Sequence, residues 1–278
     1  MASSSEEQRL TGTTRSLVIG IDRAVLAFSK HWLALFNGLI FLYVALPILA
    51  PALMNAGLER PARLIYTAYS PMCHQMAQRS FFLFGEQPVY PSAAAGTDYR
   101  PLEAYMGDLP EFAGVSAANW PAFFAAARDF LGNKQMGYKM ALCERDIAIY
   151  GFVLVGGLLY AMLRKQVNIR PLPLLLFVIV GMGPIALDGF SQLFGYLGQT
   201  PPGAAEPSWL TLLLGRLFPL RESPPLIRTF TGAWFGLCVA WLVFPQINGG
   251  MANVERELDA KLGAAGARPE SAEASHNL

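Results

Sequence analysis

Cysteine and histidine side chains that could bind a metal ion or undergo thiol chemistry lie in two short motifs. Cys73 and His74 are adjacent in the first motif, and Cys143 opens the second. Three chemistries fit these residue types: a structural disulfide, a zinc-like metal site and a redox-active thiol pair. The metal ligands would be Cys73, His74, Cys143 and Asp188. We rank the disulfide first, the metal second and redox chemistry third, because adjacent residues do not easily ligate one ion.

A second set of polar residues interrupts hydrophobic segments. Asp188 and Gln192 are four residues apart, so they lie on one face of a helix. A carboxylate within a bilayer needs a partner or a water-filled cavity. The candidate partners are Arg79, Arg145 and Arg228, through bidentate pairs. We interpret such a pair first as a structural clasp between two helices, and the alternative is a proton or ion relay.

The composition is that of a membrane protein. Of the 278 residues, 53% are hydrophobic and only 15% are charged, whereas average domains carry about a quarter charged residues. The net charge of +1 argues against nucleic-acid binding. Three cysteines are too few for a disulfide-rich scaffold. The polar segment 1–16 lacks the positive start of a secretory signal, so the first hydrophobic segment is expected to remain as an anchor.

Four hydrophobic segments are long enough to cross a bilayer. The predicted spans are residues 32–54, 143–163, 172–197 and 227–244. Proline and glycine residues are expected to interrupt the third span, at Gly181, Gly183 and Pro184. We therefore predict an all-α polytopic transmembrane helical bundle of about four spans with an outer-loop subdomain.

The regions outside the spans complete the expected organisation. Residues 1–30 form an N-terminal tail with an interfacial helix, or alternatively an extension of the first span. Residues 31–245 form the membrane domain, and residues 246–278 form a C-terminal tail. Within the first outer loop, a helix near residues 120–130 carries Phe123, Phe124 and Phe130, which we expect to be available for docking.

The basic loop between the second and third spans predicts the orientation. Arg164, Lys165 and Arg170 lie in this loop with no acidic residue, which is typical of a cytoplasmic loop. With four spans, we expect a multi-pass plasma-membrane protein whose two termini both lie in the cytoplasm. This topology brings the candidate polar cluster to the outer membrane face. Its members are Cys73, His74, Gln75, Arg79, Ser80, Cys143, Arg145, Asp146, Asp188, Gln192 and Arg228.

Small residues on the fourth span support this convergence. Arg228, Gly232, Gly236 and Ala240 recur every four residues, so Arg228 heads a face suited to close helix packing. We therefore expect Arg228 to point into the bundle rather than into lipid.

Four motifs in order, CHQMAQRSFFLFG, LCERDIAIYG, LDGFSQ and RESPPLIRTFTGAWFG, carry a family resemblance. The chain resembles the domain-of-unknown-function 2085 family, which comprises multi-pass membrane proteins of bacteria and archaea. The resemblance implies a small helical membrane protein and no particular activity. Family members usually have a short link between the two cysteine motifs, so residues 87–137 resemble an insertion that could dock other membrane subunits. The implied signature residues are Cys73, His74, Gln75, Arg79, Ser80, Cys143, Arg145, Asp188, Gln192 and Arg228.

Three classes of function remain open from the sequence. The first is a structural or accessory subunit, or a protein that binds a zinc-like metal ion or another ligand. The second is a membrane enzyme that uses Cys73, His74 and Cys143 for thiol-redox or metal chemistry. The third is a transporter, which a polar cluster far from the membrane midplane disfavours.

Overall fold

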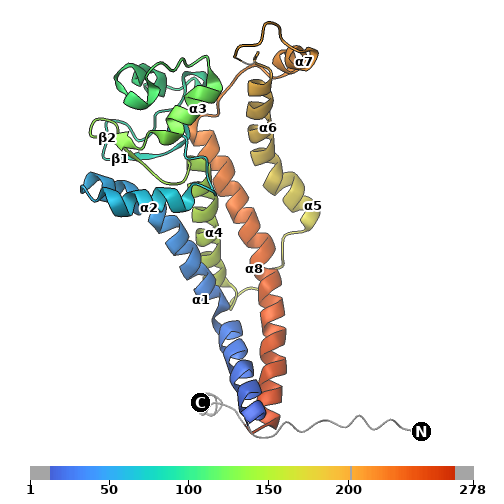
Figure 1. Ribbon diagram of the computed structural model, residues 1–278. Coiled ribbons are helices and arrows are strands. Elements are labelled where there is room, and N and C mark those ends of the chain that lie inside the picture. Colours follow the sequence, from blue (N-terminus) through green and yellow to red (C-terminus); the bar gives the residue numbers. More distant parts are fainter. Residues whose placement is uncertain (1–12, 201, 267–278) are drawn as a thin grey trace. The chain divides into compact units, whose positions relative to one another are not determined.

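The computed structural model describes residues 13–200 and 202–266, which are mostly helical (Figure 1). Four of its helical segments are long and apolar enough to cross a membrane. The prediction of an all-α membrane protein with about four spans is confirmed. The segments are α1 (Thr13–Asn55), α4 (Glu144–Leu163), α5 to α6 (Leu174–Leu197) and α8 (Pro225–Ala264).

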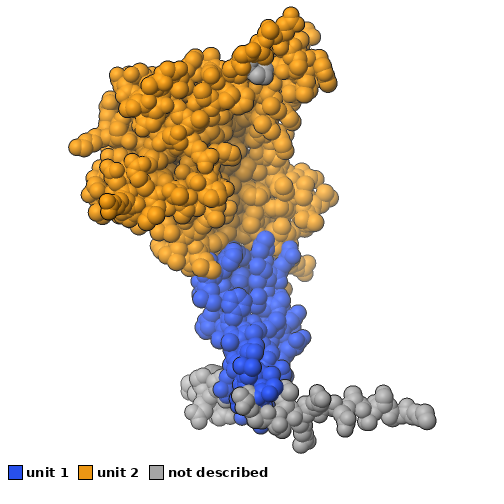
Figure 2. All heavy atoms as spheres, viewed as in Figure 1, with its two compact units in different colours: residues 1–36, 243–278 blue, residues 37–242 orange. Residues whose placement is uncertain are grey.

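The chain divides into two compact units, residues 1–36 with 243–278 and residues 37–242 (Figure 2). In the first unit, the rings of Trp32 and Phe36 pack on Phe244, with ring centroids 6.2 and 5.5 Å apart. The expected interfacial segment is continuous with α1, and α8 continues into the expected C-terminal tail as far as Ala264. Residues 1–12 and 267–278 of the two expected tails lie outside the described residues. Every candidate site residue lies in the second unit.

Helices α4 and α8 approach closely where α8 has no side chain. A Cβ atom added at Gly232 would lie 2.7 Å from the carbonyl oxygen of Arg145. One added at Gly236 would lie 2.3 Å from the carbonyl oxygen of Ile149. The backbones of the two helices are therefore in direct contact, which fixes the start of α4 against the start of α8.

The third span contains the expected interruption. A short helix α5 (Leu174–Leu176) leads into a π-helical segment, Phe177–Met182, and then into α6 (Gly183–Leu197). Pro184 lies in the first turn of α6, where it has no N–H to continue the regular pattern. The indole N–H of Trp234 donates to the carbonyl oxygen of Val180 at 2.7 Å, so α8 satisfies one acceptor of the π-helical segment.

The loop between α1 and α4 forms a small subdomain with its own core. Its sheet has the order β1-β3-β2, and both pairs are antiparallel. The elements are α2 (Glu59–Tyr69), α3 (Trp120–Asp129), β1 (Phe82–Leu83), β2 (Gly132–Asn133) and β3 (Gly137–Lys139). Single 3₁₀ turns lie at Ala77–Arg79, Ala93–Ala95, Leu102–Ala104, Met106–Asp108 and Pro110–Phe112. Helix α7 (Trp209–Leu217) lies in the loop between α6 and α8.

The aromatic face of α3 packs inside this subdomain. Phe123 and Phe130 are only 3% and 1% exposed, and they belong to a core that also contains Phe82, Tyr90 and Phe112. The expectation that these phenylalanines are available for docking is therefore wrong for Phe123 and Phe130. The subdomain buries these two side chains because a loop of this length needs an apolar core of its own.

Candidate functional site

The two cysteine motifs meet at the start of α4. Cys73 lies in the loop after α2, Cys143 immediately precedes α4, and Asp146 lies in its first turn. The two sulfur atoms and one carboxylate oxygen all lie within 4.8 Å of one another. Cys143 Sγ lies 3.2 Å from Asp146 Oδ2. All three cysteines of the chain are free thiols, so the disulfide that we ranked first is not formed in this structure.

Two backbone N–H groups point at the sulfur of Cys73. The amide of Cys143 lies 3.3 Å from Cys73 Sγ, and the amide of Gln75 lies 3.5 Å from it. A hydrogen bond from the side-chain thiol of Cys143 lowers the pKa of Cys73 below its usual value, although burial and Asp146 oppose this effect. Conversely, the hydrogen bond with Cys73 and burial raise the pKa of Cys143. Cys73 is therefore the residue of the pair that is prepared to be a thiolate.

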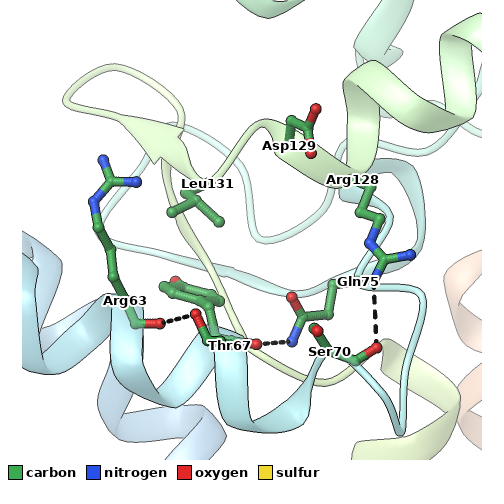
Figure 3. Close-up of a pocket in the computed structure, with 8 residues that line it drawn as sticks. Arg63, Thr67, Ser70, Gln75, Arg128, Asp129 and Leu131 are labelled. Atoms are coloured by element: carbon green, nitrogen blue, oxygen red, sulfur yellow. Dashed lines mark hydrogen bonds between the residues drawn. The ribbon is translucent and has the colours of Figure 1, made fainter.

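Gln75 holds the Cys73 loop in its conformation. Its φ of 52° is a left-handed conformation that side chains other than glycine rarely adopt. Its amide Nε2 donates to the carbonyl oxygens of Tyr66 and Ala141, both at 2.9 Å. Figure 3 shows this side chain reaching the backbone of α2 in a shallow cavity of about 310 Å³, with Arg63 and Arg128 on opposite sides. The glutamine of the CHQ motif thus positions the cysteine rather than reacting.

Lys139 supports the same loop from below the surface. Its fully buried ammonium group donates to the carbonyl oxygens of Gln75 at 2.5 Å, Arg128 at 2.6 Å and Ala127 at 3.3 Å. Tyr66 donates its hydroxyl to the carbonyl oxygen of Lys139. Burial lowers the pKa of Lys139 to about 7. The loop that carries Cys73 is therefore tied to the end of α3 as well as to α2.

A second polar cluster surrounds Asp188, which is 6% exposed. Arg145 donates to its carboxylate, and Arg221 Nη2 lies 3.1 Å from Asp188 Oδ1. Ser223 donates its hydroxyl to the same carboxylate, and Gln192 Nε2 lies 3.1 Å from Asp188 Oδ2. The buried charge is therefore paired and fully hydrogen-bonded, as its position within a candidate membrane span requires.

A parallel cluster surrounds Glu222, which is 2% exposed. Arg79 makes a bidentate contact with it, through Nε at 2.6 Å and Nη2 at 3.2 Å. Arg228 and the hydroxyl of Tyr196 also donate to this carboxylate. Burial alone would raise the pKa of Glu222, but Arg79 and Arg228 outweigh it and hold the pKa of this carboxyl below its usual value. Arg228 Nη2 also donates to Gln192 Oε1 at 2.7 Å, which joins the two clusters.

The structure thus brings most of the candidate residues together. Of the three expected partners of Asp188, Arg145 pairs with it, whereas Arg79 and Arg228 pair with Glu222. Ser80 is buried and donates its hydroxyl to the carbonyl oxygen of Met76 at 2.9 Å, so it stabilises a turn.

His74 and Asp188 are not part of the thiol group. His74 is exposed, although it lines the same cavity as both cysteines. Asp188 is occupied by Arg145 and Arg221. The carboxylate that accompanies the cysteines is Asp146, since it lies one helical turn after Cys143 on α4.

Several residues outside the candidate cluster also take part in these contacts. Arg221, Glu222 and Ser223 come from the loop before α8, and their signal in the sequence was the RESPP motif. Glu144 is 1% exposed, and neither of its carboxylate oxygens has a hydrogen-bond partner. A buried carboxylate without a hydrogen-bond donor is energetically costly. Arg228, Arg79 and Arg145 act on Glu144 through their charge, without a direct hydrogen bond.

A cavity of about 240 Å³ connects the two kinds of chemistry. The thiol group forms one part of its wall, and three arginines form another. The lining residues are Met72, Cys73, His74, Gln75, Met76, Arg79, Cys143, Arg145, Asp146 and Arg228. A species bound at the thiols would therefore lie near guanidinium groups.

Comparison with known proteins matches residues 134–242 to the family described as "Predicted membrane protein (DUF2085)". The family resemblance is confirmed. The part that matches the family contains α4, α5 and α6, and the first part of α8. It also contains, of the two carboxylate clusters, every residue except Arg79. The chain is a multi-pass membrane protein.

One curated relative extends the similarity. Over 181 residues, the chain is 25% identical to "Uncharacterized protein MJ1492" of Methanocaldococcus jannaschii. The alignment covers 65% of this chain and 67% of that protein. No solved structure matches the chain. Neither description names an activity, so function rests on the site itself.

Proposed function

We propose that this protein is a metal-binding membrane protein that holds a zinc-like transition-metal ion at Cys73, Cys143 and Asp146. The observation that carries the proposal is the mutual approach of these three ligand atoms to within 4.8 Å. In a tetrahedral site with bonds of about 2.3 Å, ligand atoms lie roughly 3.7 Å apart. Small side-chain movements are therefore enough to bind an ion.

The surroundings of Cys73 support a thiolate ligand. Metal ions bind cysteine as thiolate, and the two backbone N–H groups on Cys73 Sγ favour that form. Two sulfur ligands and one carboxylate suit zinc better than magnesium or calcium, which prefer oxygen ligands alone. Three protein ligands leave a fourth position open toward the cavity that His74 also lines. An open position is typical of sites that bind a further ligand at the metal.

The two carboxylate clusters give this proposal a structural component. They join the loop after α2 and the starts of α4 and α8 to α6, through Asp188 and Tyr196. In the proposed topology, these ends face the outside of the plasma membrane and both termini are cytoplasmic. Fusions of an alkaline phosphatase reporter to the C-terminus and to the loop 198–226 test that orientation, and activity of the C-terminal fusion would contradict it.

A thiol-redox function is the second candidate, because the pKa of Cys73 is lowered while that of Cys143 is raised. Such a pair suits thiol–disulfide exchange, in which one thiolate attacks and the other thiol resolves.

Docking of other membrane subunits on residues 87–137 would use the outer surface of the subdomain, because Phe123 and Phe130 are buried inside it.

Metal titration of the reduced, detergent-purified protein separates these functions. Cobalt(II) bound by thiolates gives near-ultraviolet charge-transfer absorption, and zinc should displace it. We expect Cys73→Ser, Cys143→Ser and Asp146→Asn each to reduce this binding at least tenfold. Cys238→Ser is the matched control, because Cys238 is a buried thiol within α8 and should have no effect.

Two results would overturn the metal function. The first is an absence of cobalt absorption together with an absence of zinc in elemental analysis of protein that retains its helical circular dichroism. The second is binding that survives Cys73→Ser. A metal-free protein whose Cys73 and Cys143 cycle between thiols and a disulfide would support the redox function instead.

A further inference from the structure

An apolar groove of about 270 Å³ lies between α4 and α8, far along both helices from the thiol group. Gly156 of α4 and Ala240 of α8 both line it. A Cβ atom added at Gly156 would lie only 2.5 Å from the Cβ atom of Ala240, so the two helices touch there. Small residues at this contact leave a hollow that the larger side chains around it do not fill.

The walls of the groove are aliphatic and come from both helices. Leu159 and Leu163 of α4 line the groove and are 47% and 42% exposed, and Leu237 of α8 lines it as well. All three belong to helices that are long and apolar enough to cross a membrane. Exposed leucines in such helices face hydrocarbon rather than water, so the groove suits an apolar chain.

Two aromatic side chains place one end of the groove at the surface of the bilayer. Tyr160 and Trp241 line the groove, and tyrosine and tryptophan concentrate at the level of the lipid headgroups. The candidate span of α4 ends at Leu163, one turn after Tyr160. Gly156 lies about 10 Å further along the helix, at a rise of about 1.5 Å per residue. The groove therefore extends from the headgroup region into the hydrocarbon core.

Basic residues lie at the same end of the groove. Arg170 directly follows Ile169, which lines the groove, and Lys165 follows Leu163 by two residues. The indole N–H of Trp241 donates to the carbonyl oxygen of Arg170 at 3.0 Å. This hydrogen bond ties the basic loop to the wall of the groove, so the positive charges lie where a lipid headgroup would be.

The described part of the chain does not neutralise these charges. Lys165 and Arg170 are exposed, and neither takes part in the ion pairs that the described residues form. No aspartate or glutamate occurs between Asp146 and Asp188, so the loop brings no acidic residue of its own. Basic residues at a membrane surface attract anionic lipids. The charge of the loop is therefore complementary to an anionic headgroup.

We infer that this groove binds an anionic phospholipid, with one acyl chain along the leucine walls and the headgroup at Lys165 and Arg170. A zwitterionic lipid fits the same walls but brings no net charge to the basic residues. In the proposed topology, this end of the spans faces the cytoplasmic leaflet, where anionic lipids concentrate. The inference needs no metal at Cys73 and Cys143, so it stands apart from the proposed function.

Quenching of tryptophan fluorescence by brominated lipids tests the inference on the full chain. The protein is reconstituted in phosphatidylcholine bilayers that contain either phosphatidylglycerol or phosphatidylcholine with brominated chains, so the two quenchers differ only in headgroup. The chain has five tryptophans, and the difference between the wild type and Trp241→Phe isolates the signal of Trp241. We expect phosphatidylglycerol to reach Trp241 with at least about fivefold higher affinity, since one basic residue contributes about that factor.

Charge variants then locate the headgroup. Lys165→Gln and Arg170→Gln should each lower the preference for phosphatidylglycerol by up to about fivefold, and the double variant should bring it close to one. Lys134→Gln is the matched control, because Lys134 is an exposed lysine of the outer-loop subdomain. Trp234→Phe is the control for the reporter, because its indole donates to Val180 on the third span and should leave the selective signal unchanged.

Each outcome decides the inference. Equal quenching of Trp241 by the two lipids would identify an unselective boundary lipid and overturn it. Absence of quenching by both lipids would mean that protein, such as a second copy of the chain, covers the groove, and would also overturn it. If the charge variants fail to fold, the wild type gives a second readout: its preference should fall as added salt screens the basic residues, and a preference that salt leaves unchanged would contradict the inference.

Discussion

Replacement of Gly236 by alanine tests whether the contact between α4 and α8 holds the membrane domain together. The new Cβ would lie 2.3 Å from the carbonyl oxygen of Ile149 and 3.2 Å from the amide nitrogen of Val153. Both are backbone atoms that cannot rotate away, so the helices must separate by about 1 Å. Overpacking of this kind costs roughly 1–3 kcal/mol, and the upper end applies where backbone is displaced.

Alanine also has a helix propensity about 1 kcal/mol better than that of glycine. The expected net effect of Gly236→Ala is therefore a loss of about 2 kcal/mol in the free energy of unfolding. The control is Gly151→Ala on α4, where the structure has nothing within 4 Å of the added Cβ. That variant should be as stable as the wild type or up to about 1 kcal/mol more stable.

Unfolding by sodium dodecyl sulfate in mixed micelles, followed by far-ultraviolet circular dichroism, measures both variants against the wild type. The difference between Gly236→Ala and Gly151→Ala should be about 2–3 kcal/mol, from the two costs above. If the two variants unfolded at the same detergent fraction, the close approach of α4 and α8 would be refuted. A change in the unfolding rate that exceeds the change in the free energy of unfolding would not count in favour of this close approach.

Two further predictions concern buried charges. Glu222→Gln should lower the free energy of unfolding by about 3–5 kcal/mol, because it leaves Arg79 and Arg228 without their carboxylate; chemical denaturation measures this loss, and an unchanged midpoint would contradict the pairing. The exposed Glu59, which pairs with Arg63 at 3.6 Å, is the matched control and should change little when mutated to glutamine. Lys139 has a pKa lowered to about 7 in the folded state, so the unfolded chain binds more protons between about pH 7 and its ordinary value near 10.4. Stability should therefore rise with pH across that window by up to about 1.4 kcal/mol per pH unit, and Lys139→Met should remove the slope; a wild-type profile that is flat there would refute the lowered pKa.

Hydropathy and small-residue spacing were enough to predict the helical framework. Four apolar segments of this length indicated four helices, because a helix satisfies all of its backbone hydrogen bonds within one segment in lipid. Gly232 and Gly236 indicated close packing, and the structure has them against Arg145 and Ile149 of α4. The break at Gly181, Gly183 and Pro184 was also visible, and it is a π-helical segment rather than a simple kink.

The pairing of charges could not be predicted in the same way. Topology brings Arg79, Arg145, Asp188 and Arg228 to one end of the spans, but it does not say which arginine meets which acid. Glu222 lies in a proline-containing loop without periodicity, so no helical face identified it as the partner of Arg79 and Arg228.

The ligand set of the thiol group shows the same limit. His74 is adjacent to Cys73 in sequence, but the structure exposes it. Asp146 approaches the cysteines because the first turn of α4 carries its side chain back toward Cys143. Such a contact depends on the position at which α4 begins, which hydropathy fixes only to within a turn.

The π-helical segment Phe177–Met182 has a consequence for how the third span tolerates changes in length. A π-helical turn holds more residues than an α-helical turn over a similar rise, so the segment contains an extra residue relative to a regular α-helix. Removal of one residue there could restore a regular helix while Asp188 keeps its bearing toward Arg145. Removal of one residue between Gly183 and Asp188 would instead turn Asp188 by about 100° and point a carboxylate at lipid. The π-helical segment therefore lets the part of the third span before it vary in length by one residue, while Asp188 keeps its orientation toward Arg145.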